Sequence, residues 1–224
     1  MDGRIQPETG WTLLIYRVPS DPASKRVAIW RDVKRLGGLY LQQCVCILPR
    51  RPDVEKKLER ITEKIPAMDG VFTLFDVPTL RPDDEDRIVA AFRDLREKEY
   101  AEIEEECSSK FMKEVEFEHF RENYTFEEAE EIGQDLEKIR RWFAQVQVRD
   151  WFAAPGRDRV TAWLDRCQLA LSSFEETVYA LHGSDDGDVP KLRTAAPAVS
   201  DESVIHVPNK SVRLGGQGEG KISS

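Results

Sequence analysis

The sequence predicts an α+β protein in which a ferredoxin-like βαββαβ domain is followed by an antiparallel three-helix domain. Three observations support this prediction. Short apolar runs alternate with helical patterns in the first third of the chain, long helical seams follow, and the charge balance changes sign between the two parts. Residues 1–80 carry 13 basic and 10 acidic side chains, whereas residues 81–183 carry 15 and 26. Such asymmetry indicates two units with different roles.

The first unit, residues 11–80, opens with the apolar run 11–16, which is typical of a strand covered on both faces. Asp21-Pro22 is a helix-start signature, and Gly37-Gly38 supplies a stop. We therefore expect a helix over 23–36. The residues expected to be buried on it are Val27, Trp30, Val33 and Leu36.

The rest of the first unit predicts a hairpin, a helix and a last strand. The strand-like pieces 39–41 and 45–48 flank a polar turn at Gln42-Gln43. A second helix starts at Pro52 and stops before Pro66, and a strand follows at 71–77. The residues expected to be buried on the second helix are Val54, Leu58, Ile61 and Ile65. The order strand, helix, strand, strand, helix, strand is a split β-α-β plan.

The second unit, residues 81–183, consists of helical seams. A long acidic helix starts near Asp83, Thr125 with Glu128 forms a capping box for a second helix, and the break 153–156 precedes a third. Short breaks between heptad-like seams predict antiparallel packing. The seam residues of the three helices are Ile88, Phe92, Leu95, Ile103, Cys107 and Phe111; Ala129, Ile132, Leu136, Ile139, Phe143 and Val146; and Val160, Leu164, Cys167, Leu171, Phe174, Val178 and Leu181.

Both ends of the chain have the composition of flexible segments. We expect a flexible N-terminus over 1–10 and a disordered tail over 184–224, because the tail has five Gly and no aromatic residue. No apolar run is long enough for a membrane span, and the first residues lack a signal-peptide pattern. A cytoplasmic protein whose four Cys are free thiols is therefore expected.

A basic cluster is the strongest functional signal. Residues 17–51 contain eight basic and two acidic side chains, and three of the basic ones share a helix face at i, i+3 and i+4. Such patches bind phosphate backbones by releasing condensed counterions, although most charge runs are only solvated faces. The expected nucleic-acid-binding residues are Arg17, Lys25, Arg26, Arg31, Lys34 and Arg35.

Other chemistry has weaker support. Cys44 and Cys46 are weak metal or redox candidates, since residues two apart on a strand face the same way, but no His stands at chelate spacing. No phosphate loop, nucleophile elbow or zinc motif is present. We expect neither a metal nor a cofactor, and we expect no enzyme. Trp142, Trp151 and Trp163 favour packing between helices or against a second subunit of a homodimer.

Segments of both units resemble the N-terminal domain of the chromate resistance regulator (ChrB) family. The matching segments are 11–19 (WTLLIYRVP), 26–31 (RVAIWR), 36–43 (LGGLYLQQ), 125–128 (TFEE), 136–142 (LEKIRRW) and 149–156 (RDWFAAPG). The resemblance implies a bacterial DNA-binding transcriptional regulator, or an accessory protein, of a chromate-resistance operon. Full-length members carry a C-terminal sensing domain, so a separately encoded C-terminal protein is an expected partner.

Two alternatives stay open. The chain could be a protein-interaction module that docks on a sensor partner through the aromatic surface near Trp151, without touching DNA. The first unit also resembles the ferredoxin-like domain of CRISPR-associated adaptation nucleases and phenylacetate-type repressors. The second alternative is therefore a metal-dependent nuclease. Those nucleases place a metal-binding Asp at the end of the first strand, where this chain has Arg17-Val18 and the next carboxylate is Asp21, and this difference counts against a nuclease.

Overall fold

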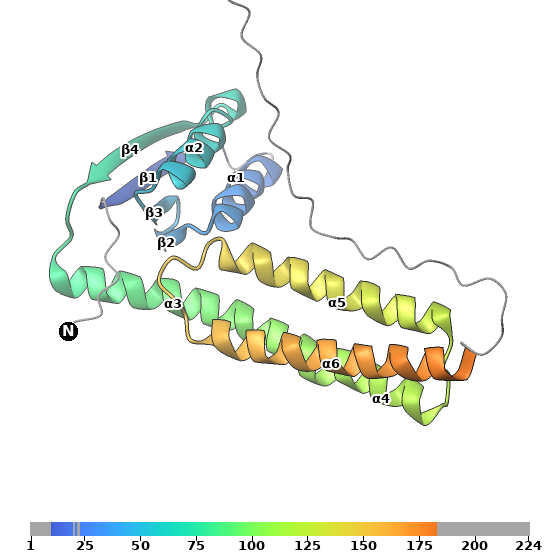
Figure 1. The fold of residues 1–224 in the computed structure, drawn as a ribbon. Helices are drawn as coiled ribbons and strands as arrows, with labels where there is room; N and C mark the ends of the chain where they lie inside the picture. The colour runs from blue at the N-terminus through green and yellow to red at the C-terminus, as the bar shows by residue number, and fades with distance from the viewer. Residues whose placement is uncertain (1–9, 20, 22, 183–224) are drawn as a thin grey trace, which may run out of the picture. The chain divides into compact units, whose positions relative to one another are not determined.

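The computed structural model describes residues 10–19, 21 and 23–182, which all belong to one compact unit. It confirms the α+β fold class (Figure 1). Apart from Gly10, the expected flexible N-terminus and the expected tail lie outside the described residues. In chain order the elements are β1 (Trp11–Arg17), α1 (Ala23–Leu36), β2 (Leu39–Gln42), β3 (Val45–Pro49), α2 (Pro52–Thr62), η1 (Pro66–Met68), β4 (Val71–Val77), α3 (Pro82–Glu105), η2 (Glu106–Phe111), α4 (Met112–Phe120), α5 (Phe126–Gln147) and α6 (Gly156–His182).

Residues 10–80, called the sheet region below, form one four-stranded sheet in the order β2-β3-β1-β4. Every neighbouring pair is antiparallel, and Leu14 at the centre of β1 faces Cys46 of β3 and Leu74 of β4. Helices α1 and α2 share one core with one face of this sheet. That core consists of Leu14, Tyr16, Val18, Ile29, Val33, Leu36, Cys46, Leu48, Val54, Leu58, Ile61 and Ile65.

The opposite sheet face is covered at one end only. There Trp11 stacks on Phe92 of α3 at 6.0 Å and on Phe152 at 5.8 Å between ring centroids, and its indole N–H donates to Glu85 at 3.1 Å. Further along, the edge strand β4 is exposed over Val71–Asp76, with Val71 66% and Phe75 47% exposed. The edge strand β4 therefore presents apolar side chains to solvent.

Helix α1 has its expected bounds, but only part of its expected buried face is correct. Val33 and Leu36 are buried as predicted, whereas Val27 and Trp30 are 38% and 47% exposed and Ile29 is buried in their place. Ile29 and Trp30 are neighbours in the sequence and lie about 100° apart around the helix axis. The sheet accepts the aliphatic stripe, which places Trp30 on the outer side.

The hairpin turn lies one residue later than expected. Gln42 pairs with Val45, so the turn residues are Gln43 and Cys44, and Cys44 has a φ of 64°. A positive φ is unusual for a residue other than Gly or Asn. Cys44 is therefore a turn residue rather than a strand residue, which removes the two-apart strand spacing on which its pairing with Cys46 rested.

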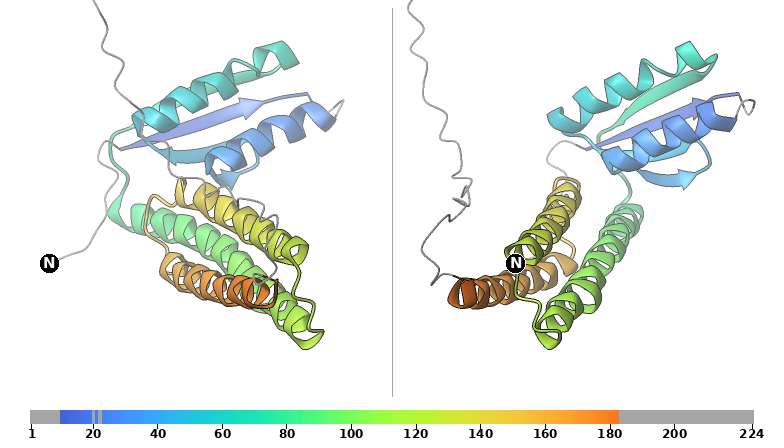
Figure 2. Two further views of the ribbon diagram at one scale, coloured as in Figure 1. Left: turned by 45° about the vertical axis from the view of Figure 1, so that its right-hand side comes forward. Right: turned by 90° about the vertical axis from the view of Figure 1, so that its right-hand side faces the viewer.

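Residues 82–182, called the helical region below, confirm the predicted seams. Helices α3, α5 and α6 pack against one another, and α5 and α6 run antiparallel (Figures 1 and 2). The seams are buried except at Leu95 and Ala129, which are partly buried, and at Leu181, which is 58% exposed. Thr125 caps α5, since its hydroxyl accepts from the Glu128 N–H at 3.1 Å.

The long acidic helix contains one π-helical turn, η2, between α3 and α4. The buried residues Ile103, Cys107, Phe111 and Val115 are each four positions apart. In a regular α-helix this spacing would rotate the last side chain by about 120° relative to the first. A π turn holds more residues per turn and absorbs part of the excess, so these side chains stay on the core side.

The tryptophans near the 153–156 break pack inside the molecule. Trp142 and Trp163 lie partly buried against the helical core. Trp151 packs against the α1 and α2 core and also against the cluster that contains Trp11 and Phe92. The aromatic surface expected near Trp151 is thus largely used internally. No helix among the described residues is long and apolar enough to cross a membrane.

Candidate nucleic-acid interface

The outer side of α1 combines positive charge with exposed apolar groups. Helix geometry places Trp30, Arg31 and Lys34 on the side away from the Ile29-Val33-Leu36 stripe, and Val27 lies among them. Arg31 is exposed and has no ion pair with any described residue. Basic groups interleaved with an aromatic ring can contact both phosphates and bases.

Two of the remaining α1 cations are held by local contacts. Arg35 pairs with Asp32 at 3.5 Å, and its own side chain stays 77% exposed. Lys34 is half-buried, and its ammonium lies over the Tyr40 ring at 5.8 Å from the centroid. Both charges therefore remain near the outer side of α1, as the i, i+3, i+4 spacing predicts.

The other predicted residues are dispersed. Lys25 lies toward the core side of α1, where it pairs with Asp69 at 3.0 Å, while Arg26 is exposed near the start of the helix. Arg17 is the last residue of β1, and strand alternation turns it away from Tyr16, which faces the α1 and α2 core. Arg17 and the α1 cations thus lie on opposite faces of the sheet, so one flat surface does not include all six residues.

A neutral tyrosine pair lies beneath the Lys34 ammonium. The hydroxyls of Tyr16 and Tyr40 are 2.8 Å apart, and burial raises the pKa of both. Both rings therefore stay uncharged across the physiological range. The Lys34 cation is stacked on an aromatic face and is not neutralised by a phenolate.

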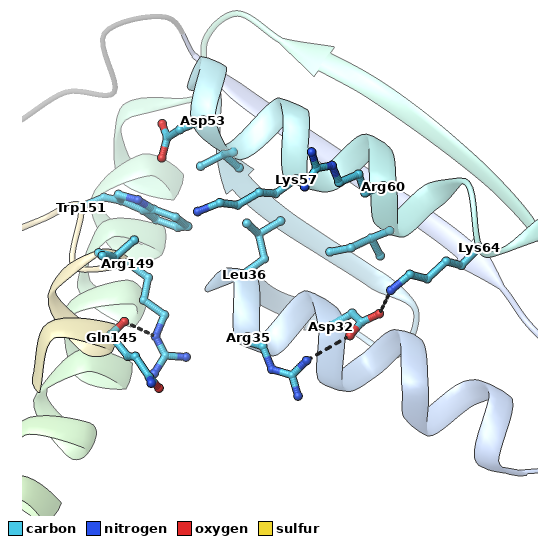
Figure 3. A pocket seen from close by; sticks show the side chains of 13 residues that line it. Asp32, Arg35, Leu36, Asp53, Lys57, Arg60, Lys64, Gln145, Arg149 and Trp151 are labelled. Carbon is cyan, nitrogen blue, oxygen red and sulfur yellow. Dashed lines mark hydrogen bonds and ion pairs between the residues drawn. The ribbon is translucent and has the colours of Figure 1, made fainter. Parts of the chain in front are cut away.

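Helix α2 adds a second basic row that our sequence reasoning missed. Lys57, Arg60 and Lys64 line a cleft of about 350 Å³ between α1, α2 and the end of α5 (Figure 3). Lys57 and Arg60 lie on α2, and Lys64 lies in the turn just after its last residue, Thr62. Their spacing of three and four residues is that of a helical stripe, so the sequence contained the signal. Arg149 completes the basic lining, and only the tertiary packing brings it there.

The cysteine candidates lie beside one another in a hydrophobic setting. Cys46 is fully buried in the α1 and α2 core, and Cys44 packs half-buried against the same core. Burial raises the pKa of the Cys46 thiol to about 12, so it stays protonated at neutral pH. Among the described residues, no three His, Cys, Asp or Glu side chains gather closely enough to hold a metal ion.

Comparison with known proteins identifies the family. The family model described as Protein ChrB, N-terminal, matches residues 26–185, which include most of α1 and every later element. The chain belongs to the ChrB N-terminal family. Protein ChrB of Cupriavidus metallidurans (strain CH34) is 31% identical over 105 residues, which are 46% of this chain and 31% of that protein. The match thus spans under a third of that ChrB protein, and no solved structure matches.

Proposed function

We propose that this ChrB-family chain is a DNA-binding transcriptional regulator, or an accessory protein, of bacterial chromate resistance. Family membership supports the link to chromate resistance. The observation that supports DNA contact is the outer side of α1, where Arg31, Lys34 and Arg35 surround the exposed Trp30. The basic side chains would neutralise phosphates, and Trp30 would stack on a base or sugar.

The opposite net charges of the two regions would orient the chain on DNA. The sheet region carries the basic excess and the helical region carries the acidic one. A polyanion is therefore attracted to α1 and repelled by the helical region, which orients the chain before specific contacts form.

The test is binding of the purified chain to its own upstream DNA across a salt series, with and without chromate. We expect sequence-selective binding whose logarithmic salt slope decreases by about 3 when Arg31, Lys34 and Arg35 are changed together to Ala. The control triple, Lys98→Ala, Lys113→Ala and Arg141→Ala, removes the same charge from exposed positions of the helical region. Equal slopes for the two triples would make the assignment wrong.

A second candidate function is a protein-interaction module that makes no DNA contact. The observation that favours it is the exposed edge strand β4, since unpaired strand edges with apolar side chains readily accept a partner strand. This surface replaces the one near Trp151, which is packed internally. A separately encoded sensor or a second copy of the chain would fit such an edge.

Two substitutions on β4 distinguish this alternative. Val71→Lys with Phe75→Lys introduces charge on the exposed strand without touching α1. If β4 is the functional surface, these changes abolish capture of the sensor partner from the native host, whereas the α1 triple variant keeps it. If the chain acts through DNA alone, the β4 variant keeps its full DNA affinity and salt slope.

A further inference from the structure

The cleft between α1, α2 and the end of α5 has walls from segments far apart in the chain. Leu36 closes the end of α1, Val54 and Ile61 come from α2, and Val148 and Trp151 follow α5. In Figure 3 the Lys57 side chain extends from α2 toward the Trp151 ring. Gly37 keeps this junction tight, because a Cβ there would lie 2.9 Å from both Arg149 Cβ and Trp151 Cη2. The cleft is therefore bounded by well-packed elements.

The lining holds more positive charge than its own acids can neutralise. Five basic side chains and two carboxylates line the cleft: Arg35, Lys57, Arg60, Lys64 and Arg149, with Asp32 and Asp53. Asp32 is shared by Lys64 at 2.7 Å and Arg35 at 3.5 Å, and Asp53 pairs outside the set with Arg51 at 3.1 Å.

Two of the five basic side chains in the lining, both on α2, have no acidic partner among the described residues. Arg149 is paired with Glu99 at 3.3 Å, but Lys57 and Arg60 form no ion pair with any described residue. Two unpaired cations, three residues apart on one helix, match the charge of a phosphate monoester, which is close to −2 at neutral pH.

The floor of the cleft is apolar, which separates this site from a simple ion site. The aliphatic side chains of Leu36, Val54, Ile61 and Val148 and the Trp151 ring offer a surface for a flat organic group. A volume of about 350 Å³ is in the range of small-molecule sites and exceeds what one inorganic oxyanion fills. Cations and an aromatic ring in one lining together suit a phosphate monoester that carries an aromatic ring.

We propose that this cleft binds a phosphate monoester that carries an aromatic ring and has the size of a mononucleotide. Lys57 and Arg60 would hold the phosphate, and the ring would lie against Trp151. The site goes beyond the proposed DNA contact, because Lys57 and Arg60 are on α2 and outside the α1 triple. Phosphate-to-cation contacts fix the orientation, and the apolar floor supplies shape recognition.

Calorimetric titration of the full chain tests this site. The ligands are AMP, GMP, CMP and UMP, with adenosine and inorganic phosphate as half-ligands. We expect saturable binding of at least one mononucleotide and at least roughly tenfold weaker binding of adenosine and of phosphate. Lys57→Ala and Arg60→Ala should each weaken mononucleotide binding by roughly tenfold. Lys56→Ala is the matched control, since Lys56 is exposed on α2 but lies outside the cleft.

Several results would overturn the proposal. Absence of mononucleotide binding at millimolar concentration contradicts it, as does equal affinity for inorganic phosphate, which would indicate an oxyanion site. Equal losses in Lys57→Ala and Lys56→Ala would indicate non-specific attraction. The outcome can be separated from DNA binding. Arg35 of the α1 triple also lines the cleft, so the double variant Arg31→Ala with Lys34→Ala tests DNA contact alone, whereas Lys57→Ala and Arg60→Ala test the cleft.

Discussion

The helical region and the sheet region bury their apolar stripes under different constraints. In the helical region three long helices have seams of six or seven residues, and nearly every seam residue is buried as its spacing predicts. In the sheet region the 14 residues of α1 bury the predicted Val33 and Leu36 together with Ile29, whereas the predicted Val27 and Trp30 are exposed. A long helix thus buries the face that its own apolar pattern marks, whereas the packing partner decides which face of a short helix is buried.

The strongest test of this contrast replaces one large aromatic residue in each region. Phe174→Ala removes a fully buried ring from α6 and should lower the free energy of unfolding by about 3–5 kcal/mol. Trp30→Ala removes a larger ring that is 47% exposed, and its loss should be below about 1 kcal/mol. Urea denaturation of both variants measures the difference. Similar losses would mean that Trp30 is a core residue after all.

A second pair of substitutions compares the two stripes on α1 itself. Ile29 is fully buried, so Ile29→Ala should cost about 2–4 kcal/mol. Val27→Ala removes a side chain that is 38% exposed and should cost about 1 kcal/mol or less. Thermal unfolding monitored by circular dichroism ranks the two. The reverse ranking would restore the face predicted from the sequence.

The third test compares a glycine at the junction between the regions with one inside a helix. Gly37 has a φ of 104°, and an added methyl would meet Arg149 and Trp151, so Gly37→Ala should cost about 1–3 kcal/mol. Gly133 on α5 has room, because its nearest contact would be Leu171 Cδ2 at 3.9 Å. Gly133→Ala should therefore stabilise the protein by up to about 1 kcal/mol. A loss for Gly133→Ala would contradict this description of α5.

The smallest effect concerns pH. The pKa of Cys46 is raised from 9.0 to about 12 by burial, so the folded state keeps this proton longer than the unfolded chain does. The stabilisation is fully present below pH 9 and decreases as the pH rises toward 12. Unfolding free energies between pH 8 and 10 should fall less steeply in Cys46→Ala than in wild type. Leu48→Ala opens a cavity in the same core but removes no titrating group, so it should keep the wild-type slope of unfolding free energy against pH.

Local signals account for what could be predicted from the sequence. The bounds of α1 and β4 are as expected, because Gly37-Gly38 and the Pro-rich segments flanking the elements act within a few residues. The basic stripe of α2 was equally readable. The exposure of Trp30 was not, because it depends on which face of α1 packs on the sheet and α2. The approach of Arg149 and Trp151 to Gly37 was not either, because it joins segments over 100 residues apart.

The π turn η2 marks the place where the acidic helix holds one residue more than a regular α-helix needs. Side-chain substitutions at the half-exposed Ser108 or the exposed Ser109 leave the turn's residue count unchanged. Deleting either one would convert the turn to regular helix and leave Phe111 and Val115 three and seven positions after Cys107, a spacing that keeps both on the core side. Homologous chains are therefore expected to tolerate the loss of one residue here, whereas an added residue would rotate α4 by about 100° and carry Phe111 and Val115 out of the core.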